Sequence, residues 1–455
     1  MREKGDYMHI DVDQKTANKV DRFRHIISCE TVSNADPSKV NWSEFDRLQG
    51  LLRTFYPTIF ELFKETKVGD AGLQLRYTVE KPRRKPFLIM SHQDVVEPGD
   101  LTQWHENPFS ASFHDGAVWG RGTTDCKHLL FAQLEAVEAL LRDGWRPDFD
   151  FYISLGYSEE IYRADGQDGG RLLAEYLRDT GVQIGCLVDE GGRIIKDESG
   201  HASAYVGLGE KAAVNFELVC NRAGGHSSKP GAGTALGQVA RAAVALEEHP
   251  FPYRLTPLVK SQLQALAETL SGDRARIYAD PEKYWDELTA LAKTDNELDA
   301  MLHTTFAVTM ASGSTQPNVM PSRASVGVSC RILQGDTVAS VTEYIRSIIP
   351  DSVEINHISG LDPQPTSTVD SDEFQLLASV IRDIYGADTT VVPFLLLGAT
   401  DSRYYAAAGV ADQVFRFGGF LVDERFGTPH AVNEHIPVDA IESAQEFVTR
   451  LLKAY

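Results

Sequence analysis

Three apolar segments between residues 87 and 192 each lead into a histidine or an acidic residue, and helix-forming segments separate them. The apolar segments are Phe87–Met90, Phe149–Leu155 and Ile184–Val188, whose length and composition predict buried strands. The stretches Leu129–Leu141 and Gly170–Thr180 between them are predicted to be helices. Strands that alternate with helices form an α/β layer with a mixed, mostly parallel sheet and helices on both faces.

Polar side chains follow each of the three predicted strands. They are His92 and Asp94, Glu159 and Glu160, and Asp189 and Glu190. Because ligands of open α/β sheets bind outside the carboxyl ends of the strands, we expect these side chains to converge. A histidine in such a place can bind a metal while a carboxylate two residues on orients its other ring nitrogen. Asp125, after the loop 120–124, adds an oxygen donor at the same edge.

These donors are sufficient for a pair of metal ions. A two-zinc site needs about three protein ligands per ion, with one carboxylate bridging both. The sequence offers His92, Asp125, Glu160, either Asp189 or Glu190, and His430. Glu159 is left over, and it can act as general base if its neighbour binds the metal. Each residue alone is also typical of a turn, a helix cap or a solvated surface, but their joint arrangement favours a metallohydrolase.

The pattern of strands and helices changes near Lys211. Loosely alternating strands and two helices then follow in the order Ala213–Cys220, Ala235–Glu247, Ala324–Ile332 and Val338–Ile348. They predict a smaller α+β domain inserted into the first domain, with a polar, helix-rich stretch over 250–302. We therefore expect a catalytic domain made of two segments, residues 1–210 and 363–455, with an inserted domain of residues 211–362 between them. Further helices are expected at Glu373–Tyr385 and Ala440–Lys453.

The composition of the chain excludes some classes of partner. A net charge of -21 disfavours binding to nucleic acid and to anionic membrane surfaces. The segment Met1–Tyr7 lacks the apolar core of a secretory signal, and no apolar run is long enough to cross a bilayer. The five cysteines are scattered and include no CxxC pair, which indicates neither a disulfide framework nor a thiolate zinc site. We expect a cytoplasmic protein.

A series of short motifs makes the prediction of function more specific. It runs His92-x-Asp94-Val95-Val96, Trp104, Pro108-Phe109, Gly116-x-Val118-Trp119-Gly120-Arg121-Gly122-x-x-Asp125-x-Lys127, Ser158-Glu159-Glu160, Val188-Asp189-Glu190-Gly191-Gly192, Gly224-Gly225-His226-Ser227-Ser228, Asn318-x-x-Pro321, Gly398-Ala399-Thr400-Asp401-Ser402-Arg403 and Thr428-Pro429-His430. In this order the motifs resemble the zinc exopeptidase family of aminoacylase, carboxypeptidase S, acetylornithine deacetylase and succinyl-diaminopimelate desuccinylase. The loop 398–403 most resembles the branch of carboxypeptidase S and aminoacylase.

The resemblance implies a role for each candidate residue and two zinc ions per chain, for which cobalt or manganese could substitute. His92 and Asp189 would hold one zinc, with Glu190 as the alternative to Asp189, and Glu160 and His430 would hold the other. Asp125 would bridge the ions, Glu159 would be the base, and Asp94 would orient His92. Asn318, Arg331 and Arg403 match positions near the substrate's carboxylate.

The resemblance also implies that the inserted domain is a lid that forms a homodimer, with His226 reaching into the partner's active site. The predicted reaction is hydrolysis of the amide or peptide bond of a small substrate with a free carboxylate, such as an N-acyl amino acid or a short peptide. A dipeptidase or aminopeptidase of the same family is the first alternative. A non-catalytic binding protein on this fold is a remote alternative, because the full set of ligands and the base is present.

Overall fold

The computed structural model describes residues 19–163, 165–231 and 233–455, and these divide into two compact units. The first unit contains the described residues up to Leu208 together with Ser367–Pro393 and Thr400–Tyr455. The second contains Gly209–Thr366 and Phe394–Ala399. The expected boundaries of the inserted domain were residues 211 and 362.

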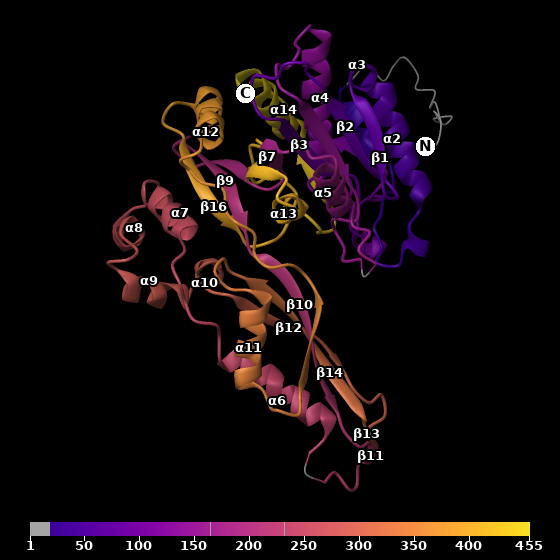
Figure 1. Ribbon diagram of the computed structural model, residues 1–455, viewed down its shortest axis with the longest axis vertical. Coiled ribbons are helices and arrows are strands. Elements are labelled where there is room, and N and C mark those ends of the chain that lie inside the picture. Colours follow the sequence, from indigo (N-terminus) through magenta and orange to yellow (C-terminus); the bar gives the residue numbers. More distant parts are fainter. Residues whose placement is uncertain (1–18, 164, 232) are drawn as a thin grey trace. The chain divides into compact units, whose positions relative to one another are not determined.

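A nine-stranded sheet forms the centre of the first unit (Figure 1). Its strands are β1 (Lys64–Val68), β2 (Gly72–Tyr77), β3 (Phe87–His92), β6 (Phe151–Gly156), β7 (Ile184–Asp189), β8 (Arg193–Lys196), β9 (Ala202–Glu210), β16 (Thr390–Leu396) and β17 (Ala411–Arg416). Their order is β1-β2-β6-β3-β7-β17-β9-β16, and β8 pairs with β9. The central strands β6, β3, β7 and β17 are parallel, whereas β1, β2 and β9 pair antiparallel with their neighbours.

The register of the parallel strands places their carboxyl ends side by side. His92 at the end of β3 pairs with Gly156 at the end of β6, and Asp189 at the end of β7 pairs with Arg416 at the end of β17. The polar residues that follow β3, β6 and β7 are therefore brought to one edge of the sheet, as expected for an open α/β sheet.

Helices cover both faces of this sheet. The helices of the first unit are α1 (Lys19–Ile27), α2 (Trp42–Phe55), α3 (Pro57–Leu62), α4 (Lys127–Arg142), α5 (Gly169–Asp179), α12 (Asp372–Tyr385), α13 (Ser402–Ala407) and α14 (Val438–Ala454). Leu88 and Met90 point to the face covered by α5 and α13. Phe87 points to the opposite face, where its ring contacts Tyr455 after α14 with ring centroids 4.6 Å apart. This alternation is what a strand buried on both faces requires.

A small three-stranded sheet lies beside the residues that follow β3. It consists of β4 (Ser112–His114), β5 (Ala117–Trp119) and β18 (His435–Pro437), in the order β18-β5-β4. Short 3₁₀ turns occur at Pro37–Lys39 and Leu101–Gln103. The pairing of β18 with β5 joins the loop before α4 to the segment before α14.

The second unit has its own four-stranded antiparallel sheet, in the order β12-β14-β10-β15 (Figure 1). Its elements are β10 (Ala212–Asn221), β11 (Gly225–His226), α6 (Ala235–Glu248), α7 (Pro257–Ala267), α8 (Gly272–Ala279), α9 (Trp285–Ala292), α10 (Asn296–Leu302), β12 (Thr305–Ser312), β13 (Val319–Met320), β14 (Arg323–Ile332), α11 (Val338–Ile348) and β15 (Glu354–Ser359). Helices α6 and α11 pack on the sheet around Val239, Val341 and Val326. Thr337 caps α11 with a capping box.

The predicted fold class is confirmed: a mostly parallel sheet with helices on both faces is accompanied by a separate, smaller α+β unit. The helices predicted at 129–141, 170–180 and 235–247 differ from α4, α5 and α6 by two residues or fewer at each end. The helix-rich stretch 250–302 contains α7 to α10. Within the described residues, none of the helices combines the length and the apolar character that a bilayer span requires.

Candidate active site

Asp125 lies at the centre of the polar cluster, between two histidines. Its Oδ1 atom is 3.1 Å from Nε2 of His92, and its Oδ2 atom is 3.0 Å from Nε2 of His430. Each carboxylate oxygen therefore faces a different imidazole. This is the arrangement of a carboxylate that bridges two metal ions.

Two further carboxylates complete a group of donors around each histidine. Glu190 Oε1 is 3.5 Å from His92 Nε2, and Glu160 Oε2 is 2.9 Å from His430 Nε2. The other carboxylate oxygen of Glu160 is buried and has no hydrogen-bond partner among the residues that the structure describes. Imidazole nitrogens and carboxylate oxygens are the ligands of catalytic zinc and related ions. An excess of acid and an unsatisfied buried oxygen fit a pair of cations.

The structure places Glu190, and not Asp189, beside His92. From the resemblance, Asp189 was the expected ligand and Glu190 the alternative. Asp189 is the last residue of β7, and its carboxylate turns to the opposite side, where Oδ2 accepts the backbone N–H of Ser402 at 3.1 Å. Successive side chains of an extended chain point to opposite faces, so only one of the two acids faces the donors around Asp125. Glu190, the alternative to Asp189, is therefore the acid that lies within reach of His92, and the identity of the ligand stays a prediction.

Asp94 lies behind His92, in the place predicted for an orienting residue. His92 Nδ1 is 3.0 Å from the backbone carbonyl of Asp94 and 3.4 Å from its carboxylate. The same carboxylate accepts the hydroxyl of Ser33 and the backbone N–H groups of Glu159 and Glu160, both at 3.3 Å. Although burial opposes ionisation, the hydrogen bonds from His92 and Ser33 hold the pKa of Asp94 below its usual range. Asp94 thus joins the ends of β3 and β6.

Glu159 is buried beside the donors without being needed in either group. Burial, and then the nearby charge of Glu190, raise the pKa of Glu159 well above its usual range. Its Oε1 atom is 3.6 Å from Nη1 of Arg403, whose guanidinium also lies over the ring of Tyr404 at 4.5 Å. A carboxyl group with a raised pKa and one cationic neighbour has the properties of a general acid and base.

Three of the predicted site residues belong to the second unit. His226 in β11 is exposed, and its Nδ1 atom lies 2.8 Å from Oγ of Ser228. Asn318 precedes β13, and its carbonyl accepts the N–H of Ser227 at 3.0 Å, so His226 and Asn318 lie on adjacent segments. Arg331 pairs with Ala213 and Thr305 in the four-stranded sheet. The roles of these three residues toward the substrate stay predictions.

Some buried residues of the site had no predicted function. Cys126 Sγ is 3.4 Å from the backbone nitrogen of His92. Asp401 is buried with both carboxylate oxygens unpartnered among the described residues, and burial raises its pKa to about 8. Arg121 and Glu434 form a buried ion pair at 2.6 Å. The motifs around Gly120 and His430 indicated these places, but only the folded chain shows which side chains meet.

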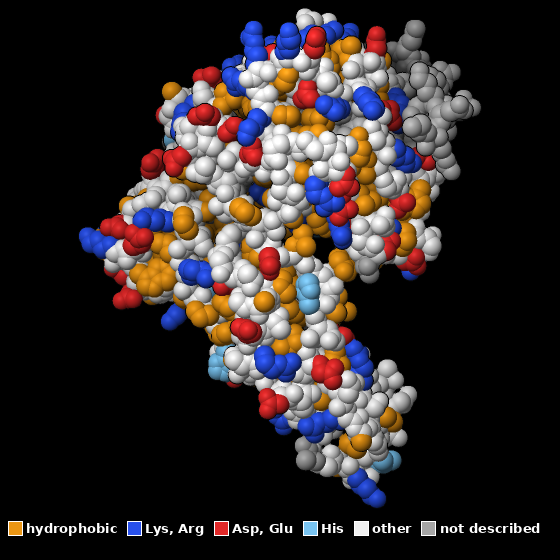
Figure 2. Space-filling model, in the orientation of Figure 1, with side chains coloured by type: hydrophobic (Ala, Val, Ile, Leu, Met, Phe, Trp, Pro, Cys, Tyr) orange, Lys and Arg blue, Asp and Glu red, His pale blue; other side chains and the backbone are white. Residues whose placement is uncertain are grey.

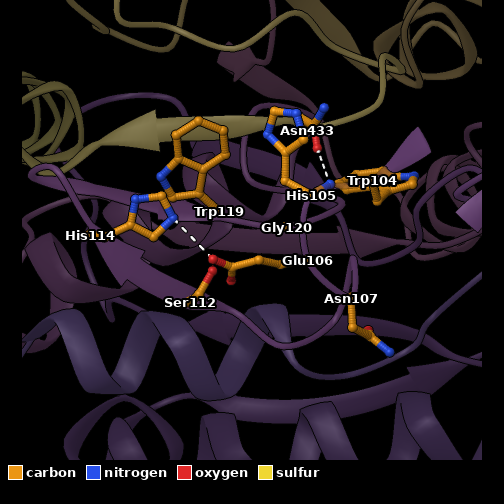
Figure 3. A pocket seen from close by; sticks show the side chains of 9 residues that line it. All are labelled: Trp104, His105, Glu106, Asn107, Ser112, His114, Trp119, Gly120 and Asn433. Atoms are coloured by element: carbon orange, nitrogen blue, oxygen red, sulfur yellow. Dashed lines mark hydrogen bonds and ion pairs between the residues drawn. The ribbon is translucent and has the colours of Figure 1, made fainter. Parts of the chain in front are cut away.

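A small cavity of about 60 Å³ lies between the loop that precedes β4 and the residues that follow His430 (Figure 3). It is lined by Trp104, His105, Glu106, Asn107, Ser112, His114, Trp119, Gly120 and Asn433. None of these residues is among the candidate metal ligands. The Trp119 ring is stacked between His114 and His435, with centroids 4.9 Å and 3.8 Å away.

Comparison with known proteins relates this site to characterised enzymes. The model of Peptidase family M20/M25/M40 matches residues 88–454. The human N-fatty-acyl-amino acid synthase/hydrolase PM20D1 is 32% identical over 380 residues, which cover 82% of this chain and 74% of the human protein. Carboxypeptidase S of Saccharomyces cerevisiae is 30% identical over 484 residues, covering 96% of this chain and 82% of the yeast protein.

Solved structures share the fold over almost the whole chain. The M20 family metallo-carboxypeptidase Sso-CP2 from Sulfolobus solfataricus matches with a TM-score of 0.71 at 18% identity, covering 96% of this chain and 99% of that one. Human carnosine dipeptidase 1 matches with a TM-score of 0.66 at 15% identity and covers 96% of this chain and 95% of its own. Because the family match includes every residue of the cluster around Asp125, the chain belongs to Peptidase family M20/M25/M40 and is a metallohydrolase.

Proposed function

We propose that this metallohydrolase cleaves the amide or peptide bond of a small substrate that carries a free carboxylate, such as an N-acyl amino acid or a short peptide at its carboxyl end. The observation that carries the proposal is the guanidinium of Arg403, held 3.6 Å from Glu159 within an acidic site. A guanidinium offers paired donors that match a carboxylate. The printed names of the human and yeast relatives, a fatty-acyl-amino acid hydrolase and a carboxypeptidase, agree with such a substrate.

The same proposal includes two metal ions per chain, with zinc as the expected metal and cobalt or manganese as substitutes. His92, Asp125 and Glu190 would hold one ion, and Asp125, Glu160 and His430 would hold the other. When bound, such ions polarise the substrate's carbonyl and make water a stronger acid. The similar YXEP protein of Bacillus subtilis, with a TM-score of 0.55 at 12% identity, is described as a dinuclear metal binding peptidase.

Three residues of the chain have the remaining roles in the proposed reaction. Glu159 accepts a proton from the attacking water and returns it to the leaving amine, so that the amide and water give a carboxylic acid and an amine. Its burial and raised pKa suit both steps. Asp94 fixes the ring of His92 through Nδ1 and leaves Nε2 free to bind a metal. Arg403 orients the substrate through its carboxylate.

We further propose a cytoplasmic homodimer in which His226 of the partner subunit completes each site and stabilises the oxyanion. Support comes from the exposure of His226 on the short β11–β13 pair, and from five buried, unpaired cysteines, which suit a reducing compartment. Mixing inactive His226→Ala and Glu159→Gln subunits should restore some activity, because one of the two sites in a mixed dimer is intact. No recovery after proven subunit exchange would exclude the shared site.

The substrate class is tested by removing the negative charge of the substrate. Amidating or esterifying the carboxyl group should cost about 2–4 kcal/mol of transition-state binding, the scale of an unpaired charge at a binding site. Arg403→Ala and Arg331→Ala should each lower kcat/KM for the free acid far more than for the amide. Arg178→Ala, in an exposed ion pair with Asp179, is the control. Equal cleavage of both substrates by the wild-type enzyme would favour a dipeptidase or aminopeptidase instead.

A further inference from the structure

A buried ion pair links two parts of the site that are far apart in the sequence. Arg121 and Glu434 are separated by 313 positions, and their side chains are 2% and 1% exposed. Nη1 of Arg121 donates to Oε2 of Glu434 at 2.6 Å. Arg121 belongs to the loop before Asp125, and Glu434 follows His430. The pair therefore connects the segments that carry the bridging acid and its second histidine.

The carboxylate of Glu434 holds the backbone next to Asp125. Its Oε1 atom accepts the backbone N–H of Thr124 at 2.6 Å and the Thr124 hydroxyl at 2.9 Å. Thr124 directly precedes Asp125, whose carboxylate lies between the two histidines. A shift of Glu434 would therefore move the bridging carboxylate.

The guanidinium of Arg121 holds the backbone of His430. Its Nη2 atom donates to the carbonyl oxygen of His430 at 3.2 Å, and its charge lies over the Trp104 ring at 5.3 Å. His430 has a φ of +63°, in the left-handed region that residues with a side chain adopt only when their surroundings impose it. The hydrogen bond from Arg121 acts on this residue directly.

Asn433 fastens the same loop a second time, at the wall of the small cavity (Figure 3). Its Oδ1 atom accepts the backbone N–H of His105 at 2.8 Å, and its amide donates to the carbonyl of Gln103 at 3.4 Å. The backbone N–H of Gly120 donates to the carbonyl of Glu434 at 2.8 Å. The loop that carries His430 is thus attached to residues 103–121 at His430 itself and through Asn433 and Glu434, which follow it.

We propose that Arg121 and Glu434 are positioning residues that set the distance between Asp125 and His430, and so the affinity for the metal ion that these two residues share with Glu160. This inference rests on the dinuclear site of the proposed function. Residues that orient metal ligands commonly change metal affinity roughly 10- to 100-fold when they are replaced. A buried ion pair by itself is weak grounds for expecting a gain in stability. Metal affinity is therefore the property that distinguishes a positioning role from a purely structural one.

The test compares two Glu→Gln variants that each disturb an arginine pair of the first unit. Glu434→Gln keeps the shape of the side chain but removes its charge. The control is Glu135→Gln, which disturbs the pair that Glu135 makes with Arg22 at 2.7 Å between α1 and α4. Zinc and cobalt are titrated into metal-free protein by calorimetry, and thermal unfolding is recorded for each variant. We expect Glu434→Gln to weaken one of the two ions roughly 10- to 100-fold, while Glu135→Gln keeps both affinities.

Three further variants separate an effect on metal affinity from a folding defect. Arg121→Lys retains the charge but replaces the two nitrogens that contact Glu434 and the carbonyl of His430 with a single one, so it should weaken binding of the same ion. Thr124→Ser keeps the hydroxyl and should bind both ions as the wild type does, whereas Thr124→Val should not. Wild-type affinities in Glu434→Gln and Arg121→Lys, or equal losses in the Glu135→Gln control, would overturn the inference. The wild-type titration itself decides whether the chain binds two ions, which separates failure of the dinuclear proposal from failure of this inference.

Discussion

Each unit of the chain contains a cluster of buried charge, and the two clusters differ in how that charge is balanced. In the first unit, Asp125, Glu160 and Glu190 converge on His92 and His430. Burial raises the pKa of Glu190 to about 7 and also raises that of Glu160. The cluster holds more carboxylates than the surrounding cationic groups can neutralise.

In the second unit, a buried lysine donates to three hydrogen-bond acceptors of the protein. Lys211 Nζ donates to the carbonyls of Ala300 and His303 at 2.9 Å and 2.8 Å and to the hydroxyl of Thr305 at 3.2 Å. Nearby, Asp336 accepts from the hydroxyl of Thr304 and from Arg254 at 2.6 Å and 2.8 Å. On the surface drawn in Figure 2, acidic and basic side chains are likewise interspersed. Lys260 and Glu282, for example, form an ion pair at 2.7 Å.

The comparison teaches that the balance of charge, rather than its presence, marks the functional site. Buried ions are costly unless they are paired or bind metals. In the second unit, Lys211 has three acceptors within the chain. The cluster around Asp125 is incomplete without cations, which agrees with its membership of a metallohydrolase family.

The largest expected effect is loss of metal when the bridging carboxylate is removed. Elemental analysis of metal-reconstituted wild-type protein should approach two ions per chain, and Asp125→Ala should retain one or none, because both ions share this ligand. Added zinc should raise the melting temperature of the wild type, since a ligand that binds only the native state stabilises it. Asp115→Ala, at an exposed position of a nearby turn, is the control. Two ions in Asp125→Ala would exclude the bridge.

The next effect concerns turnover at constant metal content. Glu159→Gln should keep the fold and both ions while losing roughly two to four orders of magnitude in kcat, the usual contribution of a general acid and base. Steady-state kinetics on an N-acyl amino acid, together with metal analysis of the same sample, measures this. Near-normal turnover would assign the base to another residue.

A variant of the second cluster should change stability and leave the metal site intact. Lys211→Met removes the donor from two carbonyls and one hydroxyl, and unsatisfied buried acceptors of this kind cost about 1–3 kcal/mol. Chemical denaturation should show this loss in the free energy of unfolding, with unchanged zinc stoichiometry. A change in metal content would contradict the division of the two clusters into structural and functional.

The last effect depends on pH: it is a change in the acid sensitivity of the first unit. His128 is buried, lies 4.2 Å from the ring of Phe420 and has an unpartnered Nδ1 within the described part of the chain. Burial lowers the pKa of His128 to about 3. Below pH 6.5 the unfolded chain therefore binds a proton that the folded chain does not bind until about pH 3. Stability falls as the pH decreases through this window, by up to about 1.4 kcal/mol per unit.

His128→Leu should remove this contribution. The unfolding free energy of the variant should depend less steeply on pH between 6.5 and 4 than that of the wild type, and the difference between the two proteins should be constant above pH 7.5. Urea denaturation at a series of pH values measures both slopes. Parallel curves across the acid range would show that His128 is charged in the folded state.

Much of the fold and of the site follows from local sequence. The segment 87–92 is an apolar run with a clear end, so the position of His92 at the sheet edge could be predicted. Helix α11 begins at Val338, as predicted, and Thr337 before it is the N-cap whose hydroxyl takes part in a capping box. Asp336, the residue before this cap, accepts from Thr304 and Arg254.

The remaining features depend on contacts that sequence patterns do not contain. The choice between Asp189 and Glu190 depends on which side of the chain faces the sheet edge where β7 ends, and both residues are acids. The pairing of Arg121 with Glu434 joins positions 313 apart. The place of β17 between β7 and β9 likewise follows from tertiary packing.

The position of β17 between β7 and β9 affects how the nascent chain can fold during synthesis. Strands β3, β6 and β7 leave the ribosome long before β17 and His430, and domains fold as units once their parts are available. Until residues 411–416 are made, β7 is a bare edge open to mispairing. His430, a ligand of the proposed metal site, is translated still later, so we expect an unfinished chain to lack the proposed activity.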